Sequence, residues 1–105
     1  MVYYSKLADE DLSNIFIGLT IWKKHPLEFN HAANYVDDIV DSCDKLDQSS
    51  YHENSQFLEH IEFGEKVYKY IRNKNTTWYI IYDFDVNSNT VYIQHITSNH
   101  ITKGK

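Results

Sequence analysis

Two runs of apolar residues at helical spacing, separated by only a few positions, most constrain how this chain can fold. In the first run apolar side chains recur at intervals of three and four residues: Leu12, Ile15, Phe16, Leu19 and Trp22. The second run keeps the same spacing: Phe29, Ala32, Ala33, Val36, Ile39, Val40, Cys43 and Leu46. This periodicity predicts two amphipathic helices. Because the link between them is short, they must pack antiparallel, and their remaining apolar surface requires a further layer.

The residues beside these runs indicate how each helix begins. Residues 2–4 are β-prone, and Ser5 directly after them can accept a hydrogen bond from a free N–H group at a helix start. Pro26 cannot continue the first helix, and we expect it in the first turn of the second. The chain is therefore predicted to open with a short strand followed by a helical hairpin.

The C-terminal part of the chain supplies the missing layer. Residues 66–72, 77–85 and 90–96 are rich in β-branched and aromatic side chains, and the polar links between them suit hairpins. In the middle strand one set of alternating residues is assigned to the core: Trp78, Ile80, Tyr82 and Phe84. The opposite face of that strand carries the intervening residues: Tyr79, Ile81, Asp83 and Asp85.

These elements predict an α+β fold in which an N-terminal strand and an antiparallel helical hairpin pack on a mainly antiparallel sheet with a C-terminal three-stranded meander. Residues 48–65 show no sustained period and are expected to form a loop with one short turn around residues 57–61. The polar residues 97–105 are expected to form an edge segment or a frayed tail.

Length and composition limit the chain to one domain, residues 1–105, with a single core. No apolar run approaches the roughly 20 residues of a membrane span, and the first residues lack the apolar segment of a signal peptide. We therefore expect a cytoplasmic protein that does not contact a membrane. Cys43 is the only cysteine, which excludes an internal disulfide, and its place in an apolar stripe predicts a buried thiol.

The charge is distributed unevenly between the two parts of the chain. Residues 1–65 hold 13 Asp and Glu but 4 Lys and Arg, a net charge of −9, whereas residues 66–105 hold 2 and 6, a net charge of +4. An anionic partner should therefore meet the C-terminal part, whereas the acidic part suits water or a basic peptide.

Two segments of the chain, the opening YYSKLADEDLSNI and the closing TWYIIYDFDVNSNTVYIQHITSNH, together resemble the RelE/ParE family of small bacterial toxins. The opening YYSKLADEDLSNI is similar to the strand and helix start of that family, although Lys6 stands where the family usually has Pro. The closing TWYIIYDFDVNSNTVYIQHITSNH is similar to the Tyr-Arg-Ile-Ile-Tyr hairpin and to the final strand that ends near a histidine. The order strand, helix, helix, loop and meander within about 100 residues gives the match its weight.

The resemblance implies the toxin of a type II toxin–antitoxin, or plasmid stabilisation, module. Such a toxin is neutralised by a cognate antitoxin protein and either cleaves mRNA in the ribosome or poisons DNA gyrase. For RNA cleavage, a base takes the proton of the ribose 2′-OH, cations stabilise charge on the phosphate, and an acid protonates the leaving oxygen. The resemblance implies no cofactor.

Carried over residue by residue, the resemblance assigns three candidate catalytic positions: Arg72, His95 and His100. Three more are assigned to substrate binding: Lys69, Tyr79 and Lys103. Tyr79 and Asp83 stand where many relatives have Arg, and Asp83 would repel a phosphate. These two residues weaken the case for endoribonuclease activity. No pair of histidines has the spacing of a metal site, and no metal is expected.

Two alternatives follow from the same residues. The acidic helices and the scarcity of arginine are consistent with a non-catalytic protein-binding module on the same scaffold. The similarity could also reflect only the order of strands and helices in an unrelated α+β domain.

Overall fold

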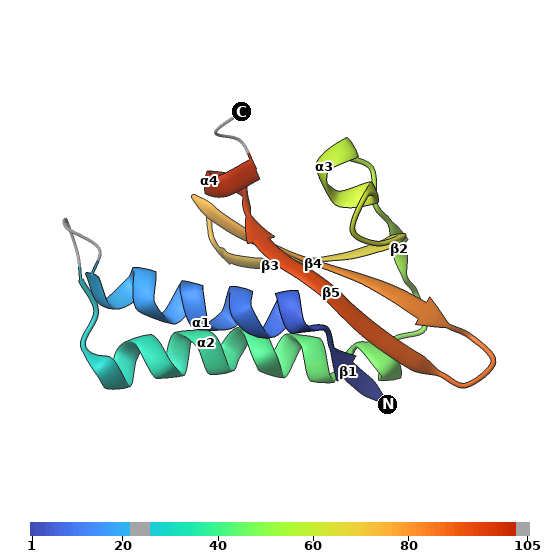
Figure 1. Ribbon diagram of the computed structural model, residues 1–105, viewed down its shortest axis with the longest axis horizontal. Helices are drawn as coiled ribbons and strands as arrows, with labels where there is room; N and C mark the ends of the chain where they lie inside the picture. Colours follow the sequence, from blue (N-terminus) through green and yellow to red (C-terminus); the bar gives the residue numbers. More distant parts are fainter. Residues whose placement is uncertain (22–25, 103–105) are drawn as a thin grey trace.

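The computed structural model describes residues 1–21 and 26–102 of the chain (Figure 1). A short strand β1 (Val2–Tyr4) leads into two helices, α1 (Lys6–Ile21) and α2 (Phe29–Asp44), and a 3₁₀ turn η1 (Leu46–Gln48). Strand β2 (Glu53–Asn54) and helix α3 (Leu58–Ile61) follow. The meander β3 (Lys66–Asn73), β4 (Thr76–Asp85) and β5 (Thr90–Ser98) ends in helix α4 (Asn99–Thr102). The expected order of helical hairpin and meander is thus present.

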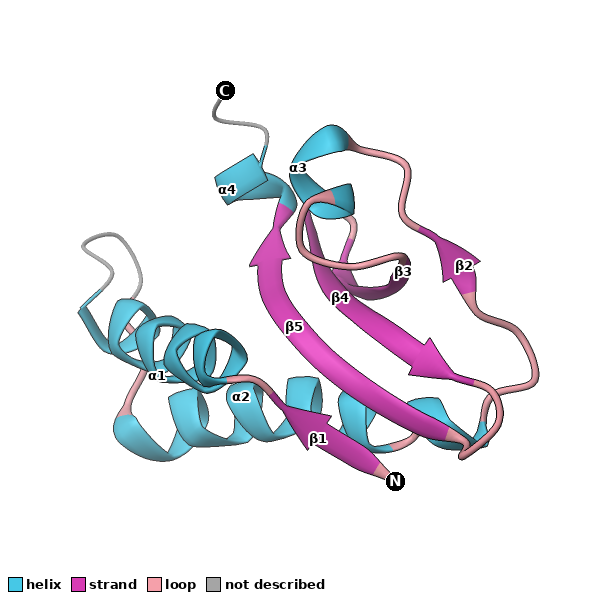
Figure 2. Ribbon diagram, turned by 45° about the vertical axis from the view of Figure 1, so that its right-hand side comes forward, coloured by secondary structure: helices cyan, strands magenta, loops and turns pink. Residues whose placement is uncertain are grey.

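The strands form one open, mixed sheet in the order β1-β5-β4-β3-β2 (Figure 2). Strand β1 pairs in parallel with β5, whereas the other three pairings are antiparallel. Helices α1 and α2 pack on one face of this sheet. The predicted α+β class and the helical hairpin on the sheet are therefore confirmed.

The start of each helix can be traced to a few backbone contacts. Ser5 Oγ accepts a hydrogen bond from the N–H of Ala8 at 3.0 Å, which is the cap expected from the sequence. Pro26 lies before α2 rather than in its first turn, so that expectation was wrong. The N–H of Leu27 bonds to the carbonyl of Leu19 at 2.9 Å, which ties residue 27 to the end of α1 and delays the second helix until Phe29. Trp22 lies outside the described residues.

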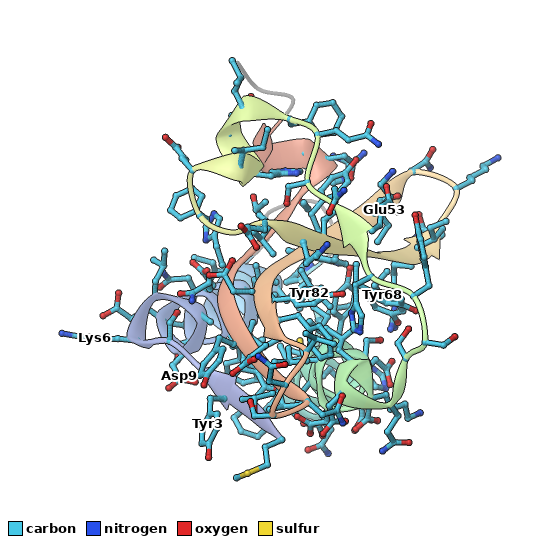
Figure 3. The ribbon with its side chains drawn as sticks, turned by 90° about the vertical axis from the view of Figure 1, so that its right-hand side faces the viewer. Tyr3, Lys6, Asp9, Glu53, Tyr68 and Tyr82 are labelled. Atoms are coloured by element: carbon cyan, nitrogen blue, oxygen red, sulfur yellow. The ribbon has the colours of Figure 1, made fainter. Side chains whose placement is uncertain are left out.

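The core lies between the helices and the expected face of β4. Trp78, Ile80 and Tyr82 are buried there, and Phe84 packs half-buried at the margin. Figure 3 shows Tyr82 pointing into the molecule, whereas Tyr3 of β1 points outward. Cys43 is fully buried in the same cluster, which confirms the prediction for its thiol. Alternation along β4 therefore identified the core correctly.

Two segments that the sequence analysis left irregular are ordered. The connecting segment, defined here as residues 49–65, contains strand β2, which the sequence did not reveal, and helix α3, which coincides with the turn expected at 57–61. Thr97 and Ser98 belong to β5, beyond the end of β1, so they pair with β4 on one side only and form an edge, as expected. They are buried and ordered, so this part of the segment is not a frayed tail.

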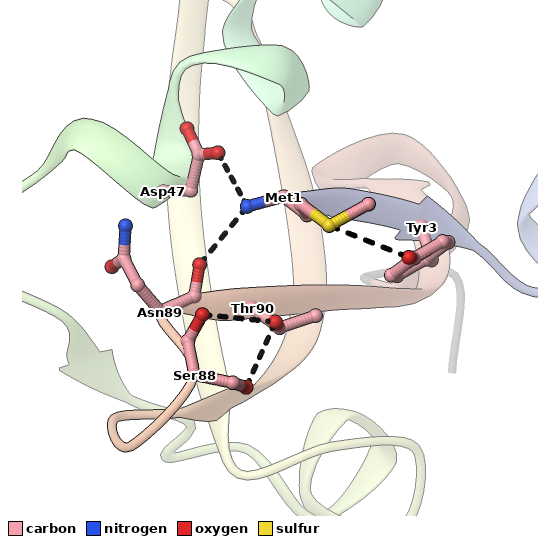
Figure 4. A network of polar contacts seen from close by, with 6 residues as sticks. All are labelled: Met1, Tyr3, Asp47, Ser88, Asn89 and Thr90. Carbon is pink, nitrogen blue, oxygen red and sulfur yellow. Dashed lines mark hydrogen bonds and ion pairs between the residues drawn. The ribbon is translucent and has the colours of Figure 1, made fainter.

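Met1 links β1 to η1 and to the β4–β5 turn (Figure 4). The amino group of Met1 lies 2.8 Å from Asp47 Oδ2 at η1 and donates to the carbonyl of Asn89 at 3.0 Å. Asn89 has a φ of 50°, a left-handed conformation that asparagine tolerates in the β4–β5 turn. These contacts hold a strand of only three residues in place.

Within the described ranges, no helix combines the length and the apolar composition needed to cross a bilayer.

Candidate functional site

The residues predicted to form one site fall into two separate groups. Lys69, Tyr79 and His95 lie together on the sheet face opposite α2, whereas Arg72 and His100 lie at the end of the β3–β4 hairpin beside α2. Lys103 is outside the described residues. We call the first group, together with His60, the sheet-face cluster.

Strand register places the sheet-face cluster. Lys69 of β3 is the direct partner of Tyr79 on β4, and His95 of β5 is the partner of Ile81, two residues further along β4. Residues opposite each other, or two apart on one strand, point to the same side of a sheet. Three of the six predicted residues therefore share one surface.

A carboxylate from α1 orients His95. Asp11 Oδ2 lies 2.7 Å from His95 Nδ1 and also accepts the N–H of Ile96 at 2.9 Å. Strand β1 pairs only with residues 91–93 of β5, so Asp11 satisfies the edge of β5 beyond the end of β1. The ring of Phe63 lies 4.2 Å from the imidazole, centroid to centroid. A neutral His95 that donates from Nδ1 keeps Nε2 as a proton acceptor.

Lys69 and Tyr79 are each engaged within the protein. Lys69 Nζ lies 3.1 Å from Glu53 Oε2 of β2, and its side chain is 45% exposed. The ring of Tyr79 lies 4.7 Å from that of His60 and 6.2 Å from that of Phe57. These side chains line a cavity of only about 30 Å³, roughly the volume of one water molecule. The connecting segment therefore packs over Tyr79 and leaves Lys69 partly exposed.

His60 is the member that sequence reasoning missed. It is 1% exposed, and its Nε2 atom has no hydrogen-bond partner. Burial lowers the pKa of His60 below that of an ordinary histidine; the carboxylate of Glu59 opposes this effect, and the charge of Lys69 adds to it. The sequence feature that could have indicated His60 is its spacing of three residues from Phe57, which is about one helical turn. The surrounding segment has no longer periodic pattern.

Asp83 has a structural role on the same face. Its Oδ1 atom accepts the N–H of Glu65 at 3.0 Å, and its Oδ2 atom accepts from Gln94 Nε2 at 3.3 Å. The carboxylate thus joins the end of the connecting segment to β5, which gives a physical reason for an acid at this position.

Arg72 contacts the helical hairpin. Its Nη1 atom lies 2.6 Å from Asp38 Oδ2 and 3.0 Å from the hydroxyl of Tyr70, and the guanidinium stacks 4.1 Å from the ring centroid of Tyr35. His100 Nε2 lies 3.0 Å from the hydroxyl of Thr76. Both residues line a cavity of about 940 Å³ between α2 and the β3–β4 hairpin.

The described residues contain no group of three or more His, Cys, Asp or Glu side chains placed to hold a metal ion. The chain was also compared with protein-family profiles, curated proteins and solved structures, and none of them matches. Function is therefore inferred from the residues and their arrangement.

Proposed function

We propose that the chain is the toxin of a type II toxin–antitoxin module, similar to the RelE/ParE toxins, and that a cognate antitoxin relieves its inhibition of growth. One observation carries the proposal: the helical hairpin covers one face of the sheet, and the other face gathers Lys69, Tyr79 and His95 beside the buried His60. The family resemblance assigns Lys69 and Tyr79 to substrate binding and His95 to catalysis.

The sheet-face cluster contains groups suited to RNA cleavage without a metal. His95 Nε2 would take the proton of the ribose 2′-OH, while Asp11 holds the other ring nitrogen. Lys69 would exchange Glu53 for the phosphate, whose charge grows as the 2′-oxygen attacks phosphorus. Burial favours the neutral form of His60, which makes this residue a poor source of a proton. The hydroxyl of Tyr79 would instead protonate the leaving 5′-oxygen.

Induction of the chain without an antitoxin tests this proposal. Growth should arrest, and His95→Ala and Lys69→Ala should restore it, whereas the exposed α1 variant Asn14→Ala should not. Fragmented mRNA in arrested cells would indicate RNA cleavage. Intact mRNA with DNA breaks that depend on gyrase would indicate the other branch. Normal growth with abundant folded protein would contradict an active toxin.

A non-catalytic protein-binding module is the second candidate, and the ion pairs favour it. Two predicted functional cations lie against carboxylates of the same chain, Arg72 with Asp38 at 2.6 Å and Lys69 with Glu53 at 3.1 Å, and the Nδ1 atom of His95 is held by Asp11 at 2.7 Å. Such pairing reduces the charge available to a phosphate. On this alternative a partner protein co-purifies and raises the melting temperature, while assays for RNA cleavage and gyrase inhibition stay negative.

A further inference from the structure

Two histidines of the connecting segment contact β4 from opposite faces of the sheet. His52 lies on the helix side, where its Nδ1 atom is 2.6 Å from the hydroxyl of Tyr82 and its ring stacks 4.0 Å from that of Phe84. His60 lies on the other side, against Tyr79 at 4.7 Å. One segment is thus fixed to one strand by two imidazoles.

Both imidazoles are placed where a second proton is unfavourable. The Nε2 atoms of His52 and His60 are buried and have no hydrogen-bond partner. A charged imidazole must donate from both nitrogens, so each site would then hold an unpaired charged donor. For His52 and His60 alike, burial is the largest cause of a lowered pKa.

The charged groups around His60 do not offset this cost. Glu59 on the same helix favours the protonated form, but Lys69 of β3 and His95 of β5 oppose it. The carboxylates that could compensate are already engaged, Glu53 of β2 with Lys69 and Asp11 of α1 with His95. At His52 burial and the charge of Lys66 act against protonation, whereas the backbone of Ser49 acts in its favour, and Tyr82 of β4 is the neighbouring titratable group.

The other anchors of the segment are short or lie near the surface. Strand β2 has two residues and α3 has four, and a backbone bond from Ser55 N–H to the carbonyl of Glu65, at 2.8 Å, closes the loop. The Glu53–Lys69 ion pair, the bond from Glu65 N–H to Asp83 Oδ1 and the ring of Phe63 against His95 add to these contacts. Three apolar side chains of the α3 region remain largely exposed: Phe57, Leu58 and Ile61. Because its elements are short and these apolar side chains are exposed, the segment opens locally at less cost than the sheet beneath it.

We propose that the connecting segment is an acid-sensitive cover over the sheet-face cluster, released when His60 and His52 take up protons. Release exposes Tyr79, His95 and the remainder of the Lys69 side chain, so the cover controls access to this face whether or not the chain is a toxin. Proton linkage gives the direction in which the stability of the closed form changes with pH. The open segment binds protons more tightly, so the closed form has its full stability above about pH 6.5 and loses it as the pH falls toward the lowered pKa of the two histidines.

Amide hydrogen exchange of the full chain tests the cover directly. We expect protection of the amides of residues 55–64 to fall between about pH 7.5 and about pH 5.0, after correction for chemical exchange, by up to about tenfold for each unit by which the His60 pKa is lowered. Amides of β4 and β5 should keep their protection. Equal protection of the segment at both pH values, or a uniform loss across all strands, would overturn the proposal.

Variants separate the role of His60 from a general effect of acid. His60→Phe keeps an aromatic ring without a titratable nitrogen, and His60→Gln keeps a polar side chain without one. Either variant, when folded, should lose most of the pH response. His31→Gln removes an exposed histidine of α2 and should retain the full response. A wild-type response in both His60 variants would refute the assignment.

Discussion

Arg72 of β3 is joined to Asp38 of α2 by a contact of 2.6 Å between Nη1 and Oδ2, and the same guanidinium stacks on Tyr35 at 4.1 Å. The hydroxyl of Tyr35 accepts a hydrogen bond from Trp78 Nε1 at 2.9 Å. Arg72 therefore ends a continuous set of contacts that runs from the surface of α2 to the core face of β4. Arg72, which the family resemblance assigns to catalysis, thus also joins the helices to the sheet.

Arg72→Ala is expected to lower the free energy of unfolding by about 1 to 2 kcal/mol, because it removes a partly exposed ion pair and a cation–π contact together. Urea denaturation measures this loss. Arg72→Lys should recover part of it, since the charge remains while the planar stacking is lost. An unchanged unfolding midpoint in Arg72→Ala would contradict the structural role.

Asp38→Ala separates that role from phosphate binding. The substitution releases the guanidinium while leaving Arg72 in place, so a toxin that uses Arg72 on phosphate should inhibit growth more strongly at equal expression. Weaker inhibition, with the protein still folded, would show that the ion pair matters only for the structure.

The residues of β4 show how much of the fold the sequence contained. The alternate positions Trp78, Ile80 and Tyr82 placed the face that packs against the helices correctly, because side chains of a strand have a period of two. The opposite face could not be anticipated in the same way. Ile81 is also fully buried there, because the connecting segment packs over it. Residues 48–65 have no periodic pattern from which that contact could be predicted.

The candidate site was predicted as one group because its members were taken from a motif, not from strand register. Arg72 is three positions from Lys69 on β3, so the alternation of side chains turns the two residues to opposite faces. The β3–β4 register also shifts between Ile71 and Asn73, a local irregularity that residue types alone did not reveal. Register, rather than composition, therefore decides which cations can act together.

Two glycines should respond oppositely to the same substitution. A Cβ on Gly64 would lie 3.0 Å from the backbone oxygen of Tyr82, so Gly64→Ala must push the connecting segment away from β4. Gly18 lies in α1 with no atom within 4 Å of its added Cβ. Gly18→Ala should raise the free energy of unfolding by about 0.5 to 1 kcal/mol. Thermal unfolding should show a decrease for Gly64→Ala, and two increases would show that the segment yields easily.

The thiol of Cys43 should be unreactive in the folded protein. Burial raises its pKa to about 12, so the reactive thiolate is scarce at neutral pH and shielded from solvent. Alkylation should be slow in buffer and rapid in denaturant, followed by mass spectrometry. Rapid labelling of the native protein would mean that α2 separates readily from the sheet.

Asp11 should matter more for stability than the histidine it contacts. Asp11→Ala removes the acceptor for the N–H of Ile96, a residue 2% exposed, and leaves that donor unpaired at a cost of about 1 to 3 kcal/mol. Asp11→Asn retains an acceptor oxygen and should cost less. His95→Ala leaves the bond to Ile96 intact and should cost less than Asp11→Ala. Asn14→Ala, an exposed change on α1, should alter the free energy of unfolding by no more than about 0.5 kcal/mol.

Urea denaturation of these four variants ranks the contributions. If His95→Ala proves as destabilising as Asp11→Ala, the packing of the imidazole against Phe63, rather than the bond to Ile96, anchors α1 to the edge of β5. If the expected order holds, His95 is dispensable for the fold, and a loss of growth inhibition in His95→Ala can then be read as a loss of chemistry. The stability measurement therefore determines how the growth experiment is interpreted.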